Sequence, residues 1–321
     1  MKVLVTGGMG FIGTNLINLL LSNDFEVLNL DKCSYASNKI FHEELASKHV
    51  NYKLKLLDLV DYGELKNSLS EFKPQIIFHL AAESHVDNSI NSPKEFINSN
   101  ILGTFHLLEA IRELNFEDIK LVHISTDEVF GSTNSEKFSE STKYDPSSPY
   151  SASKAASDHL VSAWNKTYGF NANITNCSNN YGPYQHSEKL IPKIIKCILN
   201  NEKIPIYGSG DQIRDWLFVQ DHVEALWNVA INGKSGETFN IGTNNELTNL
   251  ALANKICNLF DVITGSTNSR NLITHVEDRL GHDQRYAIDA SKIRKSLNWK
   301  PKYNFDDSLK TTLTWYLKYF K

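Results

Sequence analysis

Two segments in the middle of the chain carry side chains that could move protons. Residues 125–131, STDEVFG, place the adjacent carboxyl groups of Asp127 and Glu128 directly after an apolar run that is typical of a buried parallel strand. Further along, the phenol of Tyr150 and the ammonium of Lys154 stand four residues apart, on one face of a predicted helix. A single proton-and-hydride pair is enough for a simple dehydrogenase. The two additional carboxyl groups therefore indicate that the reaction also includes an elimination.

Tyr150 and Lys154 could oxidise an alcohol together with a nicotinamide cofactor. A phenol has an unperturbed pKa of about 10, so it is a poor base at neutral pH. A lysine ammonium one helical turn away, together with a positive nicotinamide ring, favours the phenolate. Tyr150 could then take a proton from a hydroxyl group while the carbon gives up a hydride, Thr126 would hydrogen-bond the same oxygen, and Lys154 would hold the nicotinamide ribose. An exposed Tyr and Lys on a helix surface are the alternative, and the N-terminal sequence argues against it.

That N-terminal sequence is typical of a dinucleotide-binding turn. A β-branched run, residues 2–6, leads into residues 7–13, GGMGFIG, and a helical pattern continues from Thr14 to Leu21. The glycines at positions 8, 10 and 13 fit the spacing G-x-G-x-x-G, which permits a tight turn, close approach of a diphosphate, and close packing of helix on strand. The diphosphate would lie at the helix N-terminus. A second predicted strand ends in Asp31, 18 residues after the last glycine, where a carboxylate binds the adenosine 2′-hydroxyl and favours NAD over NADP.

Composition and charge indicate a globular enzyme. The chain has 321 residues, of which 41% are hydrophobic and 22% charged, and a net charge of −4, which argues against a nucleic-acid partner and against a polybasic membrane surface. The four cysteines, at positions 33, 177, 197 and 257, are too scattered for a disulfide framework or a metal site. No apolar stretch reaches transmembrane length, and the first residues enter a predicted strand instead of a signal sequence. We therefore expect a cytoplasmic protein without a bound metal.

The predicted strands and helices alternate along the chain. Strand-like runs cover Val3–Val5, Val27–Leu30, Tyr52–Leu57, Ile76–Leu80, Leu121–Ile124 and Ala172–Cys177, and helical patterns cover Leu16–Leu21, Tyr62–Glu71, Ile101–Leu114 and Ala152–Tyr168. This alternation predicts an α/β fold, a doubly wound parallel (Rossmann) sheet, with a smaller mixed C-terminal lobe. We expect residues 1–177 and about 212–244 in the dinucleotide-binding domain, and about 178–211 and 245–321 in the second lobe. Ligands of such sheets gather beyond the carboxyl ends of the strands, where all the candidate residues fall.

Several longer segments carry a resemblance to a known family. The pattern Gly-x-x-Gly-x-x-Gly at positions 7, 10 and 13 and the pair Tyr150 and Lys154 resemble the extended short-chain dehydrogenase/reductase superfamily. More narrowly, the chain resembles the dTDP-glucose 4,6-dehydratase family over nearly its whole length. The segments that carry this resemblance are HLAAESHVD (79–87), STDEV (125–129), YSASK (150–154), NCSNNYGP (176–183), EKLIP (188–192), QIRDW (212–216) and DRLGHD (278–283).

The resemblance implies a complete catalytic cycle. Tyr150 removes the O4 proton while C4 of the hexose gives a hydride to NAD, and the resulting 4-ketone acidifies the C5 proton. Glu128 abstracts that proton and Asp127, as a general acid, protonates the C6 hydroxyl so that water leaves. The hydride then returns to C6 and Glu128 returns a proton to C5. This role requires Asp127 to be protonated near neutral pH while Glu128 is ionised, as happens when two carboxyl groups lie close together.

The resemblance also implies binding residues for the cofactor and for the nucleotide sugar, which we expect in the second lobe. The implied NAD contacts are Gly7, Gly10, Phe11, Ile12, Gly13, Asp31, Lys32, Cys33, Ser34, Asp58, Leu59, Leu80, Ala81, Ala82, Ser84, Ser99, Tyr150, Lys154 and Asn180. The implied substrate contacts are Ser84, Thr126, Asn179, Lys189, Leu190, Pro205, Tyr207, Arg214, Asn249, Arg279 and His282. The cations among them suit the oxygens of a nucleoside diphosphate.

Alternatives to this substrate and to this activity stay open. The loop after Gly131 is shorter than in bacterial members, the chain stops at Lys321 before a tail found in longer relatives, and His186-Ser187 replaces a frequent Phe-Pro. A UDP-glucose 4,6-dehydratase is therefore an alternative. A nucleotide-sugar 4-epimerase has no use for two extra carboxyl groups, a decarboxylase would suffer repulsion between its substrate carboxylate and Asp127, and an NAD-sensing regulatory protein is the non-enzymatic alternative. The resemblance further implies a homodimer held by a four-helix bundle of Ile101–Leu114 and Ala152–Tyr168.

Overall fold

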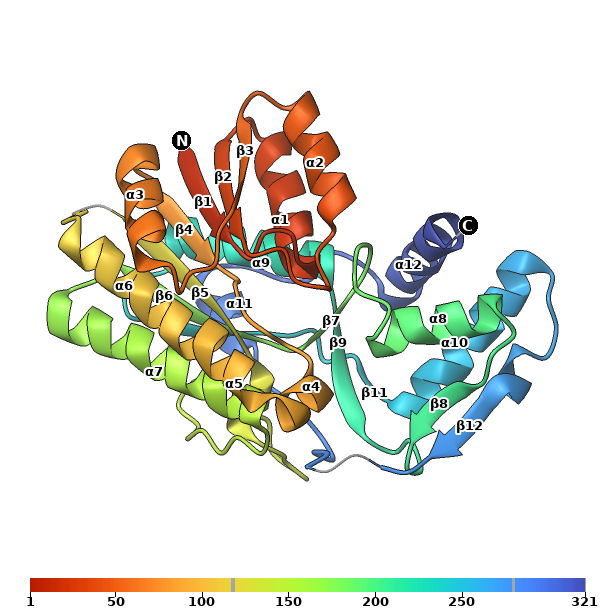
Figure 1. The fold of residues 1–321 in the computed structure, drawn as a ribbon. Coiled ribbons are helices and arrows are strands. Elements are labelled where there is room, and N and C mark those ends of the chain that lie inside the picture. The colour runs from red at the N-terminus through yellow and green to blue at the C-terminus, as the bar shows by residue number, and fades with distance from the viewer. Residues whose placement is uncertain (117–118, 279–280, 321) are drawn as a thin grey trace.

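The computed structural model describes residues 1–116, 119–278 and 281–320 of the chain. Figure 1 shows a large twisted sheet between two layers of helices, with a smaller lobe beside it. No helix within these described ranges is both long enough and apolar enough to cross a lipid bilayer.

The large sheet is parallel throughout and has seven strands. They are β1 (Lys2–Thr6), β2 (Glu26–Asp31), β3 (Tyr52–Leu56), β4 (Ile76–His79), β5 (Lys120–Thr126), β6 (Ala172–Cys177) and β10 (Thr238–Ile241). Their order is β10-β6-β5-β4-β1-β2-β3, so the winding direction reverses between β1 and β4. A crevice opens beyond the carboxyl ends of the strands at such a reversal, and this is the usual ligand site of the fold. The predicted α/β Rossmann class is confirmed.

Alternate residues of the strands fill two separate cores. Val3 and Val5 pack with α1 (Phe11–Ser22), α2 (Lys39–Lys48), α9 (Val219–Asn232) and α11 (Ser291–Ser296). Leu4, between them, packs on the opposite face with α3 (Tyr62–Phe72), α6 (Gly103–Glu113) and α7 (Pro149–Tyr168), as Figure 1 shows. Because both faces are covered, the inner strands β4, β5 and β6 are buried along their whole length.

The smaller lobe has its own core and two small sheets. One sheet has the order β11-β9-β7, from Glu246–Thr248, Ile213–Phe218 and Asn179–Tyr181, and the other pairs β12 (Ile273–Val276) with β8 (Ile204–Tyr207). The helices α8 (Leu190–Leu199), α10 (Asn249–Thr264) and α12 (Phe305–Tyr319) and the 3₁₀ turn η3 (Ser269–Leu272) pack with them. Ala290, Ile293 and Trp299 fall in the range expected for this lobe but pack in the core of the large sheet. Conversely, β9 falls in the range expected for the dinucleotide domain but pairs within the small sheet.

The helix predicted over Ile101–Leu114 is the end of a longer helical run. The run contains α4 (Val86–Asn91), α5 (Pro93–Phe96), the π-helical segment η1 (Ile97–Leu102) and then α6. Within η1, Asn100 is buried and its side-chain amide donates to the carbonyl of Glu83 (3.0 Å) and to Ser153 Oγ (2.8 Å). Its Oδ1 accepts from the Glu83 N–H at 2.8 Å. The segment therefore ties the loop after β4 to α7, the helix that carries Tyr150.

Candidate active site

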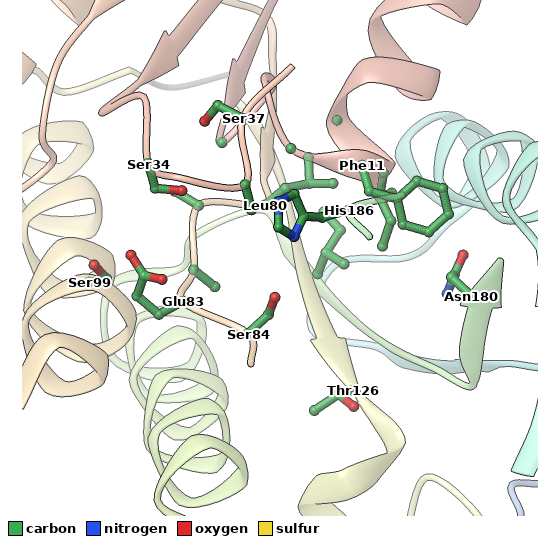
Figure 2. Close-up of a pocket in the computed structure, with 18 of the residues that line it drawn as sticks. Phe11, Ser34, Ser37, Leu80, Glu83, Ser84, Ser99, Thr126, Asn180 and His186 are labelled. Carbon is green, nitrogen blue, oxygen red and sulfur yellow. The ribbon is translucent and has the colours of Figure 1, made fainter. Parts of the chain in front are cut away.

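A cavity of about 310 Å³ opens at the carboxyl edge of the large sheet, where the strand order reverses. Figure 2 shows Ser34 and Ser37 towards one end of it and Thr126 at the other, with Phe11 and Asn180 on one side. All the predicted NAD contacts line this cavity except Cys33. Of the predicted substrate contacts, Ser84, Thr126, Asn179 and Lys189 line it. The structure therefore brings most of the predicted site together from segments far apart in sequence.

The glycine turn allows the backbone to approach a ligand closely. Gly7 has φ +70°, and a Cβ at this position would lie 2.6 Å from the backbone nitrogen of Ala81. A Cβ on Gly13 would lie 2.5 Å from Cα of Gly8, so the first turn of α1 can pack on the glycine turn only without it. Gly10 is the N-cap of α1, and no side chain caps the helix there. The N–H of Gly8 donates to Asn29 Oδ1. The sequence spacing assigned the tight turn to Gly8, but Gly7 is the residue with a positive φ there.

The Asp31 carboxylate is held beside this turn by backbone donors. It accepts from the N–H of Met9 at 2.8 Å and from the N–H of Cys33 at 2.7 Å. Burial raises the pKa of Asp31, and these two hydrogen bonds oppose the rise. Cys33 does not line the cavity. Its backbone, with φ +59°, instead presents the N–H that donates to Asp31.

A charged bridge spans the cavity wall between β2 and the helical run. Lys32 Nζ lies 2.7 Å from Glu83 Oε1 and donates to Ser99 Oγ at 2.7 Å. Glu83 lines the cavity but was not among the predicted contacts. Its position directly after the β4 strand is the signal that could have identified it.

The two adjacent carboxyl groups lie at the end of β5, in the 3₁₀ turn η2 (Asp127–Phe130). Thr126 caps this turn: its hydroxyl oxygen accepts from the Glu128 N–H at 3.3 Å, and the hydroxyl donates to Asp127 Oδ1 at 3.4 Å. Asp127 is only 2% exposed, and its Oδ2 has no hydrogen-bond partner among the described residues. Burial, and then the charge of Glu128, raise the pKa of Asp127 well above its ordinary value. The structure thus favours a protonated Asp127.

Tyr150 and Lys154 project from the first turns of α7 towards the same end of the cavity. The helix begins with a capping box in which Ser148 and Ser151 bond each other's backbone, followed by Pro149 at its first position. Tyr150 is buried against Val86 and Phe96. Lys154 is also buried, and its Nζ donates to the carbonyl of Ile124 at 2.8 Å.

Burial governs the electrostatics of Tyr150 and Lys154. Burial, and then the charge of Glu128, raise the pKa of Tyr150 well above its ordinary value, whereas a hydrogen bond from Thr126 lowers it. The ammonium of Lys154 donates to the Ile124 carbonyl at 2.8 Å. Burial thus opposes the phenolate, and a positive charge in the cavity would favour it.

Comparison with known proteins agrees with this geometry. The model of the family described as GDP-mannose 4,6 dehydratase matches residues 4–312. The dTDP-glucose 4,6-dehydratase of Salmonella typhimurium is 47% identical over 336 residues, covering 99% of this chain and 93% of that protein. Among solved structures, the dTDP-glucose 4,6-dehydratase DesIV from Streptomyces venezuelae, with NAD and TYD bound, has a TM-score of 0.93 and 38% identity, covering 99% of this chain and 97% of that one. The chain belongs to the dTDP-glucose 4,6-dehydratase family.

Epimerases share the fold of this dehydratase family, so the fold alone does not separate the two activities. The UDP-glucose 4-epimerase of Thermotoga maritima has a TM-score of 0.89 at 26% identity, with full coverage of both chains. The side chains at the end of β5 must make the distinction. A buried acid beside a second carboxyl group suits an elimination and has no task in an epimerisation.

The other predicted substrate contacts that the structure describes lie in the second lobe, outside the lining of the cavity. Tyr207 packs edge-on against His282 at 6.1 Å, and its hydroxyl donates to Asp87 Oδ2 at 3.3 Å across the two lobes. Arg214 is buried, stacks over the Tyr286 ring at 4.1 Å, and donates to the carbonyl of Asp283 at 2.9 Å. Leu190 and Asn249 begin α8 and α10, and Pro205 lies in β8. Arg279 lies outside the described residues.

Some lining residues of the dehydratase cavity were missed from the sequence. They lie in two loops, after β2 and after β7, and are Tyr35, Ala36, Ser37, Gln185, His186 and Glu188. Tyr35 donates to Glu188 Oε1 at 3.1 Å and packs edge-on against His186, so the two loops meet over the cavity. His186 lies between Leu80 and Phe11 in Figure 2. Loops have no periodic pattern, and only the position of these residues beside recognisable segments could have indicated them.

Gly7→Ala should weaken cofactor binding. The added Cβ would meet the backbone of Ala81, at 2.6 Å, and neither backbone can move without opening the cavity. We expect at least a roughly tenfold higher Kd for NAD, measured by calorimetry, since about 1.4 kcal/mol corresponds to a factor of ten. Gly169→Ala is the matched control: Gly169 has φ +73° but no atom within 4 Å of a Cβ. Equal NAD affinity of the two variants would contradict the assignment of the turn.

Proposed function

We propose that the protein is an NAD-dependent hydro-lyase that converts dTDP-glucose to dTDP-4-keto-6-deoxyglucose. The observation that carries the proposal is the pair Asp127 and Glu128, placed beside Tyr150 and Lys154 at one end of a dinucleotide cavity. The curated relatives named dTDP-glucose 4,6-dehydratase, which match along nearly the whole chain, support the same activity.

The residues of the cavity fit NAD. The positive φ of Gly7 and the uncapped N-terminus of α1 leave backbone N–H groups for a diphosphate, and Asp31 offers a carboxylate to a ribose. Bound NAD would supply the positive ring that favours the Tyr150 phenolate, accept a hydride from C4 of the sugar and return it to C6. The DesIV structure, which holds NAD, supports this cofactor.

Each chemical step then has a group with suitable charge. Tyr150 takes the proton of the C4 hydroxyl, and the Thr126 hydroxyl hydrogen-bonds the same oxygen. Glu128, half-buried beside it, takes the C5 proton that the new ketone has acidified. Asp127, kept protonated by burial and by Glu128, gives its proton to the C6 hydroxyl, which leaves as water. Glu128 finally returns its proton to C5. The proton that Tyr150 took from O4 balances the one that Asp127 gave to the leaving water, and exchange with solvent moves it so that all three groups regain their first state.

The nucleotide of the substrate would lie between the two lobes. Lys189 reaches from the second lobe to the cavity, where its ammonium donates to the carbonyl of Ser84 at 2.9 Å. Tyr207 and His282 form a ring pair farther along the same lobe and could hold a base. We propose the division into a dinucleotide domain and a nucleotide-sugar lobe on this basis.

The decisive experiment offers the purified protein and NAD either dTDP-glucose or UDP-glucose, and determines the product by mass spectrometry. We expect loss of one water without net formation of NADH, faster for the thymidine nucleotide. Faster turnover of UDP-glucose would change the proposed base of the substrate from thymine to uracil and leave the proposed reaction unchanged. A product of unchanged mass would indicate an epimerase, and NAD binding without turnover of either sugar would contradict the proposed function.

Asp127→Asn and Glu128→Gln should separate oxidation from elimination. Both variants keep Tyr150, so C4 is still oxidised and the NADH absorbance at 340 nm rises and persists. Overall turnover should fall by about 10²–10⁴-fold, the usual contribution of a general acid or base. Tyr150→Phe is the control and should give no absorbance rise. Normal turnover by Asp127→Asn would contradict the role of this acid.

The stability of Asp127→Asn should reveal the charge state of the carboxyl group. Because burial raises the pKa of Asp127 above its unfolded value, the protonated group stabilises the fold fully below the unfolded pKa, and this contribution is lost as the pH rises through the folded pKa. Asparagine does not titrate. Urea unfolding should therefore show the variant gaining stability relative to the wild type as the pH rises from the unfolded pKa of Asp127 towards its raised folded pKa. A pH-independent difference would mean that Asp127 does not carry the raised pKa.

We also propose a homodimer formed through η1, α6 and α7. Ile97, Leu102 and Phe105 expose 49%, 37% and 37% of their surfaces on the first two segments, and Tyr168 exposes 51% on α7. Phe105 and Trp164 pack edge-on at 6.0 Å, so both helices contribute to one apolar face. Phe105→Asp should reduce the mass in light scattering from twice 36.4 kDa to 36.4 kDa. Val262→Asp, 81% exposed on α10, should leave the dimer intact, and a monomeric wild type would refute it.

A further inference from the structure

A buried polar network lies behind Lys154 and has no part in the steps above. His123 on β5 is at its centre: its Nε2 lies 3.4 Å from Lys154 Nζ and 3.1 Å from Asp158 Oδ1. Asp158 follows Lys154 by one helical turn on α7, so both side chains point to the same side of the helix. All three residues are at most 4% exposed.

The Asp158 side chain accepts hydrogen bonds on both oxygens. Oδ2 lies 2.8 Å from Ser125 Oγ, 3.0 Å from the Tyr144 hydroxyl and 3.4 Å from Asn176 Nδ2, and each of these groups donates to it. Oδ1 faces His123. A carboxylate can accept all four bonds, whereas a protonated acid would have to give up one of them to donate its own proton. The network thus surrounds Asp158 with groups that can donate to it.

His123 lies between the two charges as a neutral ring. Burial, and then the charge of Lys154, lower the pKa of His123 to about 4. If Nε2 carries the ring proton it donates to Asp158, whereas an unprotonated Nε2 would set a lone pair against the carboxylate at 3.1 Å. The first tautomer is therefore favoured, and the ammonium of Lys154 directs a hydrogen bond to the Ile124 carbonyl instead.

Asp158 is the negative charge that acts on Lys154. Burial lowers the pKa of Lys154, and the charge of Asp158 is the largest effect that opposes it. The other titratable groups that face this part of the site favour no charge: burial raises the pKa of Cys177 on β6 to about 12 and lowers that of His79 on β4, and it raises that of Tyr150. The charge balance behind the active site thus depends on one carboxylate.

We propose that Asp158 is a positioning residue that keeps Lys154 in its ammonium form at the active site, with His123 as a neutral spacer between the two charges. A neutral Lys154 would no longer provide a positive charge beside Tyr150. The consequence for turnover rests on the proposed function, but the charge state of Lys154 does not.

The direct test is an NMR titration of the protein labelled with ¹³C at lysine Cε, in which Lys154→Met assigns the Lys154 signal. The wild type should show a protonated Lys154 at pH 7. Asp158→Asn should lower the midpoint of its titration by at least about one pH unit, the usual effect of one nearby opposite charge. Asp158→Glu should restore it. Tyr144→Phe is the matched control, because it removes a donor to the same carboxylate but leaves the charge, and its midpoint should stay close to that of the wild type.

Kinetics with dTDP-glucose provide a second reading. The alkaline limb of the kcat profile should move to lower pH in Asp158→Asn by the same amount as the NMR midpoint, and not in Tyr144→Phe. An unchanged Lys154 midpoint in folded Asp158→Asn would overturn the proposal. If that variant does not fold, a neutral Lys154 in the wild type at pH 7 would overturn it equally well. A wild type without dehydratase activity would refute the proposed function while leaving the NMR result valid.

Discussion

The burial of ionisable groups at the end of β5 is the constraint on which the rest of the site depends. Asp127, Tyr150 and Lys154 carry groups that water would otherwise solvate, and in the protein they are almost completely enclosed. Burial disfavours the charged form of each of them. For Asp127 the result is the protonated acid that an elimination needs, whereas for Tyr150 and Lys154 it opposes the required charges, so compensation must come from the cofactor and from Asp158.

The parallel sheet makes this enclosure possible. Helices cover both faces, so the inner strands bury every residue, and the side chains that reach the cavity come from the carboxyl ends of the strands. The turn after β1, Asp31 after β2, Glu83 and Ser84 after β4, and Asp127 after β5 therefore reach a single cavity. The second lobe closes this edge from the other side, through Lys189 and the loop that carries His186.

The sequence was most informative where packing imposes a period or a continuous apolar run. All six predicted strands are present, because apolar and β-branched residues recur along each of them. The predicted helix over Ile101–Leu114 lacked its π-helical beginning, since a wider turn has no distinct residue pattern. The glycine spacing placed the tight turn one residue late, at Gly8. Gly7 and Gly8 are adjacent, so the turn could begin at either one, and only the close approach of Gly7 to Ala81 distinguishes them.

Contacts between distant segments could not be predicted from the sequence. The four-residue spacing brings Tyr150 and Lys154 to one helix face but does not show that Lys154 turns towards Ile124 and His123. β9 was expected in the dinucleotide-binding domain but pairs within the small sheet. Trp299 was expected in the second lobe but packs in the core of the large sheet. Chain order does not determine which surfaces meet. The meeting of Tyr35 with Glu188 over the cavity depends on two loops that are 153 residues apart.

In the proposed mechanism, one site performs oxidation, elimination and reduction in turn on the same sugar. The most direct measurement uses dTDP-glucose with deuterium at C4, mixed with substrate that carries only ¹³C, and locates the deuterium in the product by NMR and mass spectrometry. We expect a dehydrated product with the deuterium at C6 of the same molecule that carried it at C4. Deuterium that remains at C4, passes to the ¹³C-labelled molecules or is lost to NAD would contradict it.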